Sequence, residues 1–424
     1  MSRVGSPPRI AIAVAVILLA AFALTRAADP APASHAPKSA ETRHVMFVGN
    51  NWEGTIDVFY TRGSFAQIAQ INAIPDIEER MLEILSDPVR LGYFIAIREL
   101  IGEGNDQFVD DMYTSNDGEL LVISRPSLRD VVALDMDSGE LVWRFVVDGQ
   151  RSDHMALSPD GKQVAVSAST GNVVHVLDVE TGAEEGSFES GDSPHENVYS
   201  ADGEKIYHAS IGLVYTPADE PTLDTTKGDR FFQVVDAETL EVLQRVDMGE
   251  KLEEAGYPGM SSAVRPMALS PDERFAYLQI SFFHGFVEYD LEKEKVTRVA
   301  DLPIAEHVKD LREEFYLLDS AHHGIAMNGN GTRLCVAGTM SDYAAIVSRK
   351  SFEFKLLRKG LKPYWSTTTN NGKYCLVSWS GTDEVSVIDY RTRKEVKRIQ
   401  VGDHPQRIRI GNVRTDWIEA QKAE

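Results

Sequence analysis

A tight-turn motif recurs along the chain and constrains its fold more than any other feature of the sequence. Six segments share it, and each runs from a polar residue through a short β-rich stretch to a turn: "DDMYTSNDG", "DHMALSPDG", "HENVYSADG", "RPMALSPDE", "HGIAMNGNG" and "YWSTTTNNG". A seventh related segment, "HPQRIRIGN", lies near the C-terminus. The seven begin at positions 110, 153, 195, 265, 323, 364 and 404, so most intervals are close to 42 residues and two longer ones indicate insertions.

Each repeat contains further β-rich stretches after its turn. The unit that begins at 153 continues with "KQVAVSAS" and "VVHVLDVETG", and a later unit ends with "EVKRIQVG". Four strands per repeat, punctuated by Gly and Asp turns, are typical of one blade of a β-propeller. The sequence therefore predicts an all-β fold, a seven-bladed β-propeller of four-stranded blades.

The last repeat is incomplete, because the chain after position 404 supplies only one strand. The N-terminal region contains three β-rich stretches outside any repeat: "HVMFVGNN", "TIDVFYTRG" and "FAQIAQINA". Pairing both ends of the chain in one blade would remove the exposed strand edges of an open array. We therefore expect a closed propeller over residues 44–412, followed by a short polar C-terminal tail over residues 413–424.

Two of these stretches carry a resemblance to a known family. "PHENVYSADGEKIYHAS" and "GTDEVSVIDYRTRKEVKRIQVGDHP" resemble the YVTN repeat of YncE-like seven-bladed propellers, which are secreted bacterial proteins. The resemblance covers nearly all of residues 44–412. Similar propellers include lactonases, sugar lyases, amine-dehydrogenase subunits and plain binding proteins, so the resemblance implies the fold and leaves the function open.

The N-terminus predicts export. "MSRVGSPPR" is basic, "IAIAVAVILLAAFAL" is an apolar run, and small residues follow, as in a signal peptide over residues 1–27 with cleavage after Ala27. An uncleaved anchor is the alternative, although an apolar run over residues 10–24 is short for a spanning helix. Residues 28–43 are predicted to form a disordered Pro/Ala spacer, and the mature protein to be secreted or periplasmic and free of the membrane.

Charge and motifs exclude several classes of partner and cofactor. The formal net charge of −22 argues against nucleic acid as a partner, because its phosphates would be repelled. We expect a small-molecule ligand and a monomeric protein. No CxxC or CxxCH motif supports haem or structural zinc, and no P-loop or dinucleotide fingerprint supports a nucleotide. Because Cys335 and Cys375 lie on equivalent strands of neighbouring repeats, and face-packed sheets are about 10 Å apart, we predict two buried free thiols.

The first residue of each motif should mark the upper end of an innermost strand, at the mouth of the central channel. This register predicts one polar ring with a few near neighbours (His154, Glu196, His322 and Trp365). The ring itself comprises Asp110, Asp153, His195, Arg265, His323, Tyr364 and His404. The alternative is that the repeat favours a polar residue here for turn geometry alone. His208, on the second strand of its repeat, is expected to support the core or the site.

Long insertions should surround this ring. Residues 75–109, 249–264 and 304–322 each connect the last strand of one blade to the first strand of the next, and 211–229 connect a second strand to a third. All four connections emerge on the same face, where they would wall in a site. Apolar spacing predicts helices within residues 77–100 and 304–318, as short insertions on that top face.

The ring residues admit two kinds of chemistry and one non-catalytic role. A divalent metal could be held by His154, His195, His323 and His404, with Asp110 or Asp153, since imidazole with carboxylate suits Mn, Fe, Ni or Zn better than Ca. Without a metal, His195 or His404 with Tyr364 would serve as base and acid, and Arg265 would hold a carboxylate or a developing enolate. Both sets suit a lyase or hydrolase acting on a small acidic, sugar-like or lactone substrate. The alternative is a propeller that binds a ligand or forms a complex without catalysis.

Overall fold

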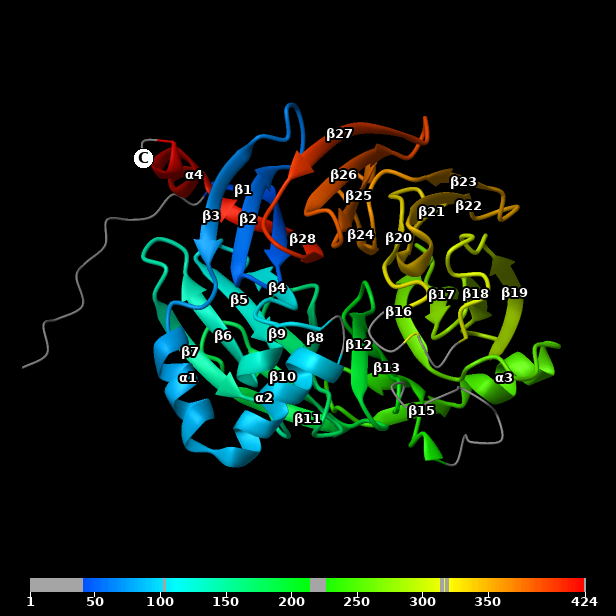
Figure 1. The fold of residues 1–424 in the computed structure, drawn as a ribbon, viewed down its shortest axis with the longest axis horizontal. Coiled ribbons are helices and arrows are strands. Elements are labelled where there is room, and N and C mark those ends of the chain that lie inside the picture. The colour runs from blue at the N-terminus through cyan, green and yellow to red at the C-terminus, as the bar shows by residue number, and fades with distance from the viewer. Residues whose placement is uncertain (1–40, 102–103, 214–225, 313–315, 317–319, 423–424) are drawn as a thin grey trace, which may run out of the picture. The chain divides into compact units, whose positions relative to one another are not determined.

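Seven four-stranded antiparallel sheets make up the fold, and they are arranged as the blades of a propeller (Figure 1). This computed structural model describes residues 41–101, 104–213, 226–312, 316 and 320–422. The predicted signal peptide and nearly all of the predicted spacer lie outside the described residues. The prediction of a seven-bladed, all-β propeller is confirmed.

The first three blades follow the chain, each from the axis outward. Blade 1 comprises β4 (Asp111–Thr114), β5 (Leu120–Arg125), β6 (Asp130–Asp135) and β7 (Leu141–Val146). Blade 2 comprises β8 (Ser152–Leu157), β9 (Gln163–Ala168), β10 (Val173–Asp178) and β11 (Glu184–Glu189). Blade 3 comprises β12 (Pro194–Tyr199), β13 (Lys205–Ser210), β14 (Phe232–Asp236) and β15 (Val242–Val246).

The next three blades continue in the same order. Blade 4 comprises β16 (Val264–Leu269), β17 (Phe275–Ile280), β18 (Gly285–Asp290) and β19 (Lys295–Asp301). Blade 5 comprises β20 (Ile325–Met327), β21 (Arg333–Gly338), β22 (Tyr343–Ser348) and β23 (Phe354–Leu357). Blade 6 comprises β24 (Pro363–Thr368), β25 (Tyr374–Trp379), β26 (Glu384–Asp389) and β27 (Lys394–Gln400).

Blade 7 joins the two ends of the chain, as predicted. Its innermost strand is β28 (Pro405–Arg414), and its outer strands are β1 (Thr42–Asn50), β2 (Thr55–Tyr60) and β3 (Gln67–Asn72). β1 pairs with β28 over most of its length, and the two strands lie side by side at the top of Figure 1. β28 also contacts β4 and β24, the innermost strands of blades 1 and 6, so the ring is closed without a free inner edge.

Apolar side chains between the blades form the core. The middle strands are buried on both faces, as in β5, whereas the outermost strands alternate between half-buried and exposed positions, as in β7. Val122, Val164 and Val166, for example, pack together from the facing sheets of blades 1 and 2. β-branched side chains suit such pleated, sandwiched surfaces.

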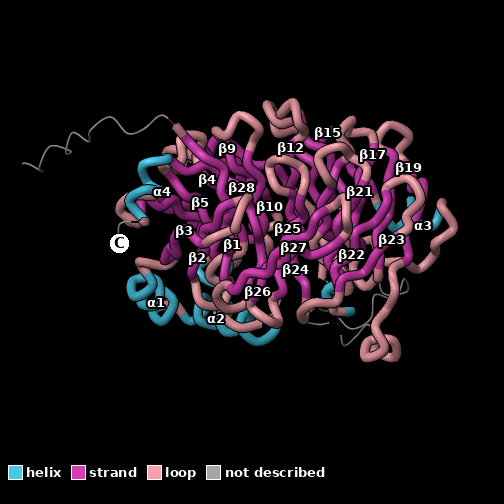
Figure 2. Tube along the Cα trace, turned by 90° about the horizontal axis from the view of Figure 1, so that it is seen from above, coloured by secondary structure: helices cyan, strands magenta, loops and turns pink. Residues whose placement is uncertain are grey.

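Helices occur in two of the long insertions on the top face. The predicted helical segment 77–100 forms α1 (Ile77–Ser86) and α2 (Pro88–Leu100), which lie together on one face of the blades in Figure 2. Asp87 separates them, because its side chain accepts hydrogen bonds from the first turn of α2 and Pro88 favours a helix start. Arg90 fastens α2 to the blade connections by donating to the carbonyl oxygens of Ser127 and Gln150.

The other helix prediction differs from the structure. Residues 304–312 form turns and no helix, and most of 313–318 lies outside the described residues. The backbone N–H of Ala305 donates to Ser341 Oγ, and Ala305 and Val308 are buried against Tyr316, so tertiary contacts replace helical ones. The sequence did not predict α3 (Met248–Glu254), which Asp247 caps. No helix in the described part of the chain is long and apolar enough to cross a membrane.

The segment predicted to be a polar C-terminal tail instead extends β28 to Arg414 and forms α4 (Thr415–Gln421). Trp417 and Ile418 are buried against blades 1 and 7, and Trp417 Nε1 donates to the carbonyl oxygen of Met136 at 2.6 Å. Trp417 and Ile418 are the two buried residues of α4, and its other residues are mostly polar, so the composition of this segment does not reveal that it packs on the propeller.

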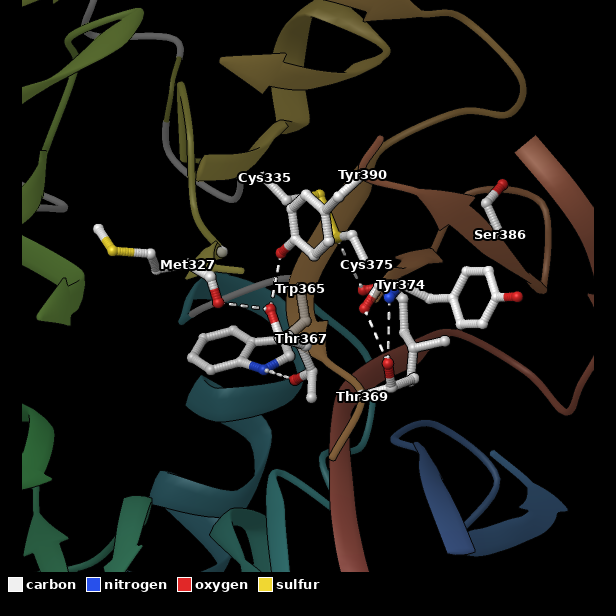
Figure 3. Close-up of a disulfide and its surroundings, with 12 residues drawn as sticks. Met327, Cys335, Trp365, Thr367, Thr369, Tyr374, Cys375, Ser386 and Tyr390 are labelled. Carbon is white, nitrogen blue, oxygen red and sulfur yellow. Dashed lines mark hydrogen bonds between the residues drawn. A yellow bond between two sulfur atoms is a disulfide. The ribbon is translucent and has the colours of Figure 1, made fainter. Parts of the chain in front are cut away.

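The prediction of two free thiols is wrong, because Cys335 of β21 and Cys375 of β25 form a disulfide between blades 5 and 6 (Figure 3). Cys335 is the third residue of its strand and Cys375 the second of its own. Adjacent strand positions point to opposite faces, so these two side chains point toward each other across the blade interface. The Cα atoms are 6.4 Å apart, closer than two sheets packed face to face, because blades converge toward the axis.

We expect the purified protein to contain no free thiol in denaturant before reduction and two afterwards. Because the disulfide closes a loop across a separation of 40 residues, its loss should reduce the free energy of unfolding by about 3–4 kcal/mol. A Cys335→Ala/Cys375→Ala variant measured by thermal unfolding should melt several degrees lower, with an unchanged circular dichroism spectrum. Two free thiols in the denatured, unreduced protein would contradict the pairing.

Candidate functional site

Three buried histidines converge on the channel from blades 2, 3 and 5. The metal-ligating atoms of His154, His195 and His323 all lie within 4.8 Å of one another. The ring centroids of His154 and His195 are 3.9 Å apart, and His323 lies 5.7 Å from each. None of the three side chains is more than 4% exposed. His323 therefore reaches across the channel from an opposite blade to meet the other two.

β-Bulges at the upper ends of the innermost strands explain why two consecutive residues reach the channel. The register of β8 on β9 shifts between Ser152 and Met155, and that of β12 on β13 shifts between Pro194 and Glu196. A bulge sets two residues of one strand against one residue of its partner and redirects their side chains. His154 thus enters the site beside Asp153, although strict alternation would point the two to opposite faces.

Carboxylates hold the ring of His154. Glu196 Oε2 lies at hydrogen-bonding distance from His154 Nδ1, and Asp153 Oδ1 is 3.5 Å from His154 Nε2. Burial raises the pKa of Glu196 to about 8. A carboxyl group on Nδ1 fixes the orientation of the imidazole and leaves Nε2 as its other ligand atom.

The imidazoles of His195 and His323 each have one buried nitrogen that makes no hydrogen bond among the described residues. Tyr364 Oη is 3.2 Å from His323 Nε2, and the two rings are stacked with centroids 4.0 Å apart. Nδ1 of His323 and Nδ1 of His195 have no hydrogen-bond partner among the described residues. Buried polar atoms in proteins are rarely left without a partner, so these two nitrogens are the candidate ligand atoms of His195 and His323.

Burial keeps the three imidazoles neutral. It lowers the pKa of His154, His195 and His323 well below the ordinary value, and nearby guanidinium groups lower it further. The Arg407 charge lowers the pKa of all three, and Arg265 has the larger effect of the two on His195. Neutral imidazole is the form that binds a metal ion.

A second group shares one of these histidines. The ligand atoms of Asp110, Asp153 and His154 also lie within 4.8 Å of one another. Asp153 is already paired with Arg151, at 2.5 Å. Burial raises the pKa of Asp110 to about 7, although Arg407 acts in the opposite direction. The three histidines therefore form the better metal-binding set, and the carboxylates lie at its border.

Arg407, a residue that the sequence analysis did not select, is buried beside the three histidines. Its guanidinium lies 4.0 Å from the centre of the Trp365 ring, and that ring lies within 6.0 Å of the rings of His154 and His323. None of its three nitrogens has a hydrogen-bond partner among the described residues, and Asp110 approaches only to 3.7 Å. Repeat alignment could have identified it, because the equivalent position three residues into the motif is Ala in blades 2, 4 and 5.

The remaining ring positions lie outside the histidine cluster. His404 stacks on Trp52 with ring centroids 3.8 Å apart, and belongs to neither group of converging ligand atoms. Arg265 Nε donates to Ser281 Oγ at 2.8 Å. His322, next to His323, turns to Tyr343 Oη at 2.9 Å. The structure thus brings together three of the four predicted metal ligands, and Tyr364 contacts one of them.

The donor set fits a divalent transition metal. Three neutral imidazoles are the ligands of one common catalytic zinc site, and imidazole also suits Cu, Fe and Ni. The orphaned Nδ1 atoms of His195 and His323 and the carboxyl on His154 are the features that such a site requires. Tyr364 would hold His323 through Nε2 and leave Nδ1 for the metal.

His208 supports the cluster without joining it. Its Nδ1 is 2.8 Å from Asn197 Oδ1 and its Nε2 is 2.7 Å from Ser190 Oγ, so both ring nitrogens are occupied. Burial lowers the pKa of His208 to about 3. Asn197 in turn donates to Ser167 Oγ, so these bonds fix β12 against blade 2 below His195.

Comparisons with known proteins establish the fold and no more. No protein-family model matches the chain, and no curated protein matches it. Among solved structures, the chain is similar to a chain of the hydrazine synthase of Kuenenia stuttgartiensis, with a TM-score of 0.54 and 15% identity, over 73% of this chain and 96% of that one. Identity at this level carries only the propeller fold.

We expect His208 to make the stability of the protein depend on pH. The unfolded chain binds a proton at this imidazole near pH 6.5 and the folded chain only near pH 3, so the free energy of unfolding should fall as the pH falls between these values. Replacing His208 with Gln should reduce the slope by up to about 1.4 kcal/mol per pH unit, measured by urea unfolding from pH 7 to pH 4. The same change at exposed His307 is the control, and an unchanged slope in His208→Gln would contradict the assignment.

Proposed function

We propose that this chain is an extracytoplasmic propeller enzyme, a lyase or hydrolase that acts on a small acidic, sugar-like or lactone substrate with the help of a divalent transition metal. The observation that carries the proposal is the convergence of three buried, neutral imidazoles within 4.8 Å. We also propose that the chain is a YncE-like, YVTN-repeat propeller, a relationship that rests on the repeat sequences.

The disulfide supports an oxidising compartment. Disulfides persist in secreted and periplasmic proteins and are rare in the cytosol. The Cys335–Cys375 bond therefore agrees with the export that the N-terminal sequence predicts. We propose a secreted or periplasmic protein on these two grounds.

The metal would be held by His154, His195 and His323. When bound, it would polarise a substrate carbonyl and lower the pKa of a bound water molecule. Glu196 orients His154 through Nδ1, and Tyr364 orients His323 through Nε2. The burial of all three imidazoles excludes bulk water, which strengthens every charge interaction at the centre.

The polar groups around the imidazoles are placed to handle protons and negative charge. Tyr364 is within hydrogen-bonding distance of His323. Its hydroxyl group could therefore exchange a proton with a substrate bound beside His323. Arg265 contributes positive charge beside His195 and His323. A developing enolate or alkoxide at this centre would therefore be stabilised. His404 has no part in this arrangement, because it is stacked on Trp52.

We expect elemental analysis of the purified protein, or of apo-protein incubated with Zn²⁺ or Co²⁺, to find a stoichiometric transition metal. His195→Ala should abolish binding, and Glu196→Gln should weaken it by about 10- to 100-fold because it alters the group that orients His154. His404→Ala should retain the metal, and is the matched control on the same channel mouth. A protein that contains no metal and takes none up would exclude a metal centre.

We expect catalysis to require both the metal and Tyr364. Activity would be sought on a panel of hydroxy-acid lactones, followed by acid release, and of uronate sugars, followed by the absorbance of an unsaturated product. Tyr364→Phe, assayed at saturating metal to offset any loss of affinity from the altered partner of His323, should lower kcat by about 100-fold or more, as for a lost acid–base group. Binding without turnover of any compound would favour the alternative, a non-catalytic ligand-binding propeller.

A further inference from the structure

The guanidinium group of Arg407 is a buried charge whose hydrogen-bonding capacity is not used within the described part of the chain. The side chain is fully buried, and Nε and both terminal nitrogens lack hydrogen-bond partners there. A guanidinium has five N–H donors and stays protonated in proteins. Donors of this kind normally meet an acceptor when they are removed from water.

The neighbouring channel arginine shows what a structural partner looks like in this fold. Arg409, two residues further along β28, binds Asp111 through two hydrogen bonds of 2.8 and 2.7 Å. Arg407 has no such partner, since Asp110 is 3.7 Å away, beyond hydrogen-bonding distance. Arg409 is therefore neutralised by a bidentate ion pair, whereas Arg407 makes no hydrogen bond to a carboxylate.

The contacts of Arg407 with its aromatic neighbour involve the face of the guanidinium, and its N–H edge makes no hydrogen bond among the described residues. Trp365 covers its face at 4.0 Å, and stacking of this kind uses the charge but none of the N–H groups. A planar acceptor with two oxygen atoms would match the edge bidentately, as carboxylates do. The Trp365 ring also borders His154 and His323, so an acceptor on Arg407 lies next to the three histidines.

We propose that Arg407 binds the carboxylate of a small monoanionic ligand and holds it beside the three histidines. This inference rests on the proposed function and narrows its substrate class to small carboxylic acids. A monoanion is favoured over phosphate or sulfate because Arg151 and Arg409 are already paired with Asp153 and Asp111, and Asp110 lies 3.7 Å from Arg407, so little positive charge is left to balance a dianion. Arg265, which the sequence suggested for this role, already donates to Ser281.

Carboxylate binding is tested first on the full-length, metal-free protein, so that it does not depend on the metal. The probes are acetate and glycolate, with acetamide and ethylene glycol as their uncharged counterparts and phosphate and sulfate as competing anions, at constant ionic strength. We expect concentration-dependent increases in Tm with the two carboxylates only. Stabilisation by phosphate or sulfate equal to that by acetate would overturn the choice of a carboxylate, and no response to any anion would overturn the site.

The variants separate Arg407 from the rest of the channel. Arg407→Met should weaken acetate binding at least 10-fold, and Arg407→Lys should recover only part of it, because an ammonium group keeps the charge and loses the planar fork. Arg409→Lys is the matched control in the same strand and should bind acetate as the wild type does. Equal loss in Arg409→Lys and Arg407→Met would assign the effect to the channel as a whole and overturn the proposal.

Asp110→Asn keeps the proposal testable if the Arg407 variants do not fold. It removes the carboxylate that lies 3.7 Å from Arg407 while retaining the guanidinium, so acetate should bind several-fold more tightly. Weaker binding in this variant would show that Asp110 and Arg407 act only as a structural pair. Metal analysis on the same preparations distinguishes the two ideas, since a protein that binds acetate and no metal supports Arg407 and refutes only the metal centre.

Discussion

The pairing of β1 with β28 is the interaction on which the rest of the molecule depends. It places the last strand of the chain between the innermost strands of blades 6 and 1, with β28 residues from Ile408 to Arg414 opposite β1 residues from Thr42 to Val48. Arg407 then reaches Trp365 of blade 6 and Asp110 beside blade 1, and neither contact would exist in an open array. Closure therefore assembles the polar centre as well as the fold.

The repeat register made the fold and half of the site predictable, because both follow from spacing. Turn residues recur at nearly constant intervals, so the seven blades, the closing blade and the positions of His195 and His323 could be derived from counting. What counting could not supply was side-chain direction. The bulges in β8 and β12 bring consecutive residues into the channel, and the one-residue offset between Cys335 and Cys375 turns two separate thiols into a disulfide.

The surroundings of His404 and Arg407 could not be predicted from the sequence, because they depend on competition for partners within the fold. His404 occupies the same motif position as His195 and His323, but it stacks on the adjacent Trp52 and does not join the other two imidazoles. The local sequence does not distinguish Arg407 from an ordinary strand residue. It is buried because β28 lies between the innermost strands of blades 6 and 1. The contacts that each of these side chains makes depend on which residues the fold brings close to it, and the spacing of residues in one sequence does not show this.

The buried charged groups in the channel are of two kinds, those with a bonded partner of opposite charge and those without hydrogen bonds among the described residues. Burying an ion pair is costly unless geometry and hydrogen bonds are good, and the pairs of Arg409 with Asp111 and of Arg151 with Asp153 meet that condition. Those cations can be explained by the fold alone, since each ties an innermost strand or its connection to a neighbour. Arg407 and the Nδ1 atoms of His195 and His323 cannot be explained this way, because they have no hydrogen-bond partner among the described residues. Such groups can be tolerated where a ligand from outside the chain supplies the partner, and this is the physical reason for our proposal that the function lies at the top of the channel.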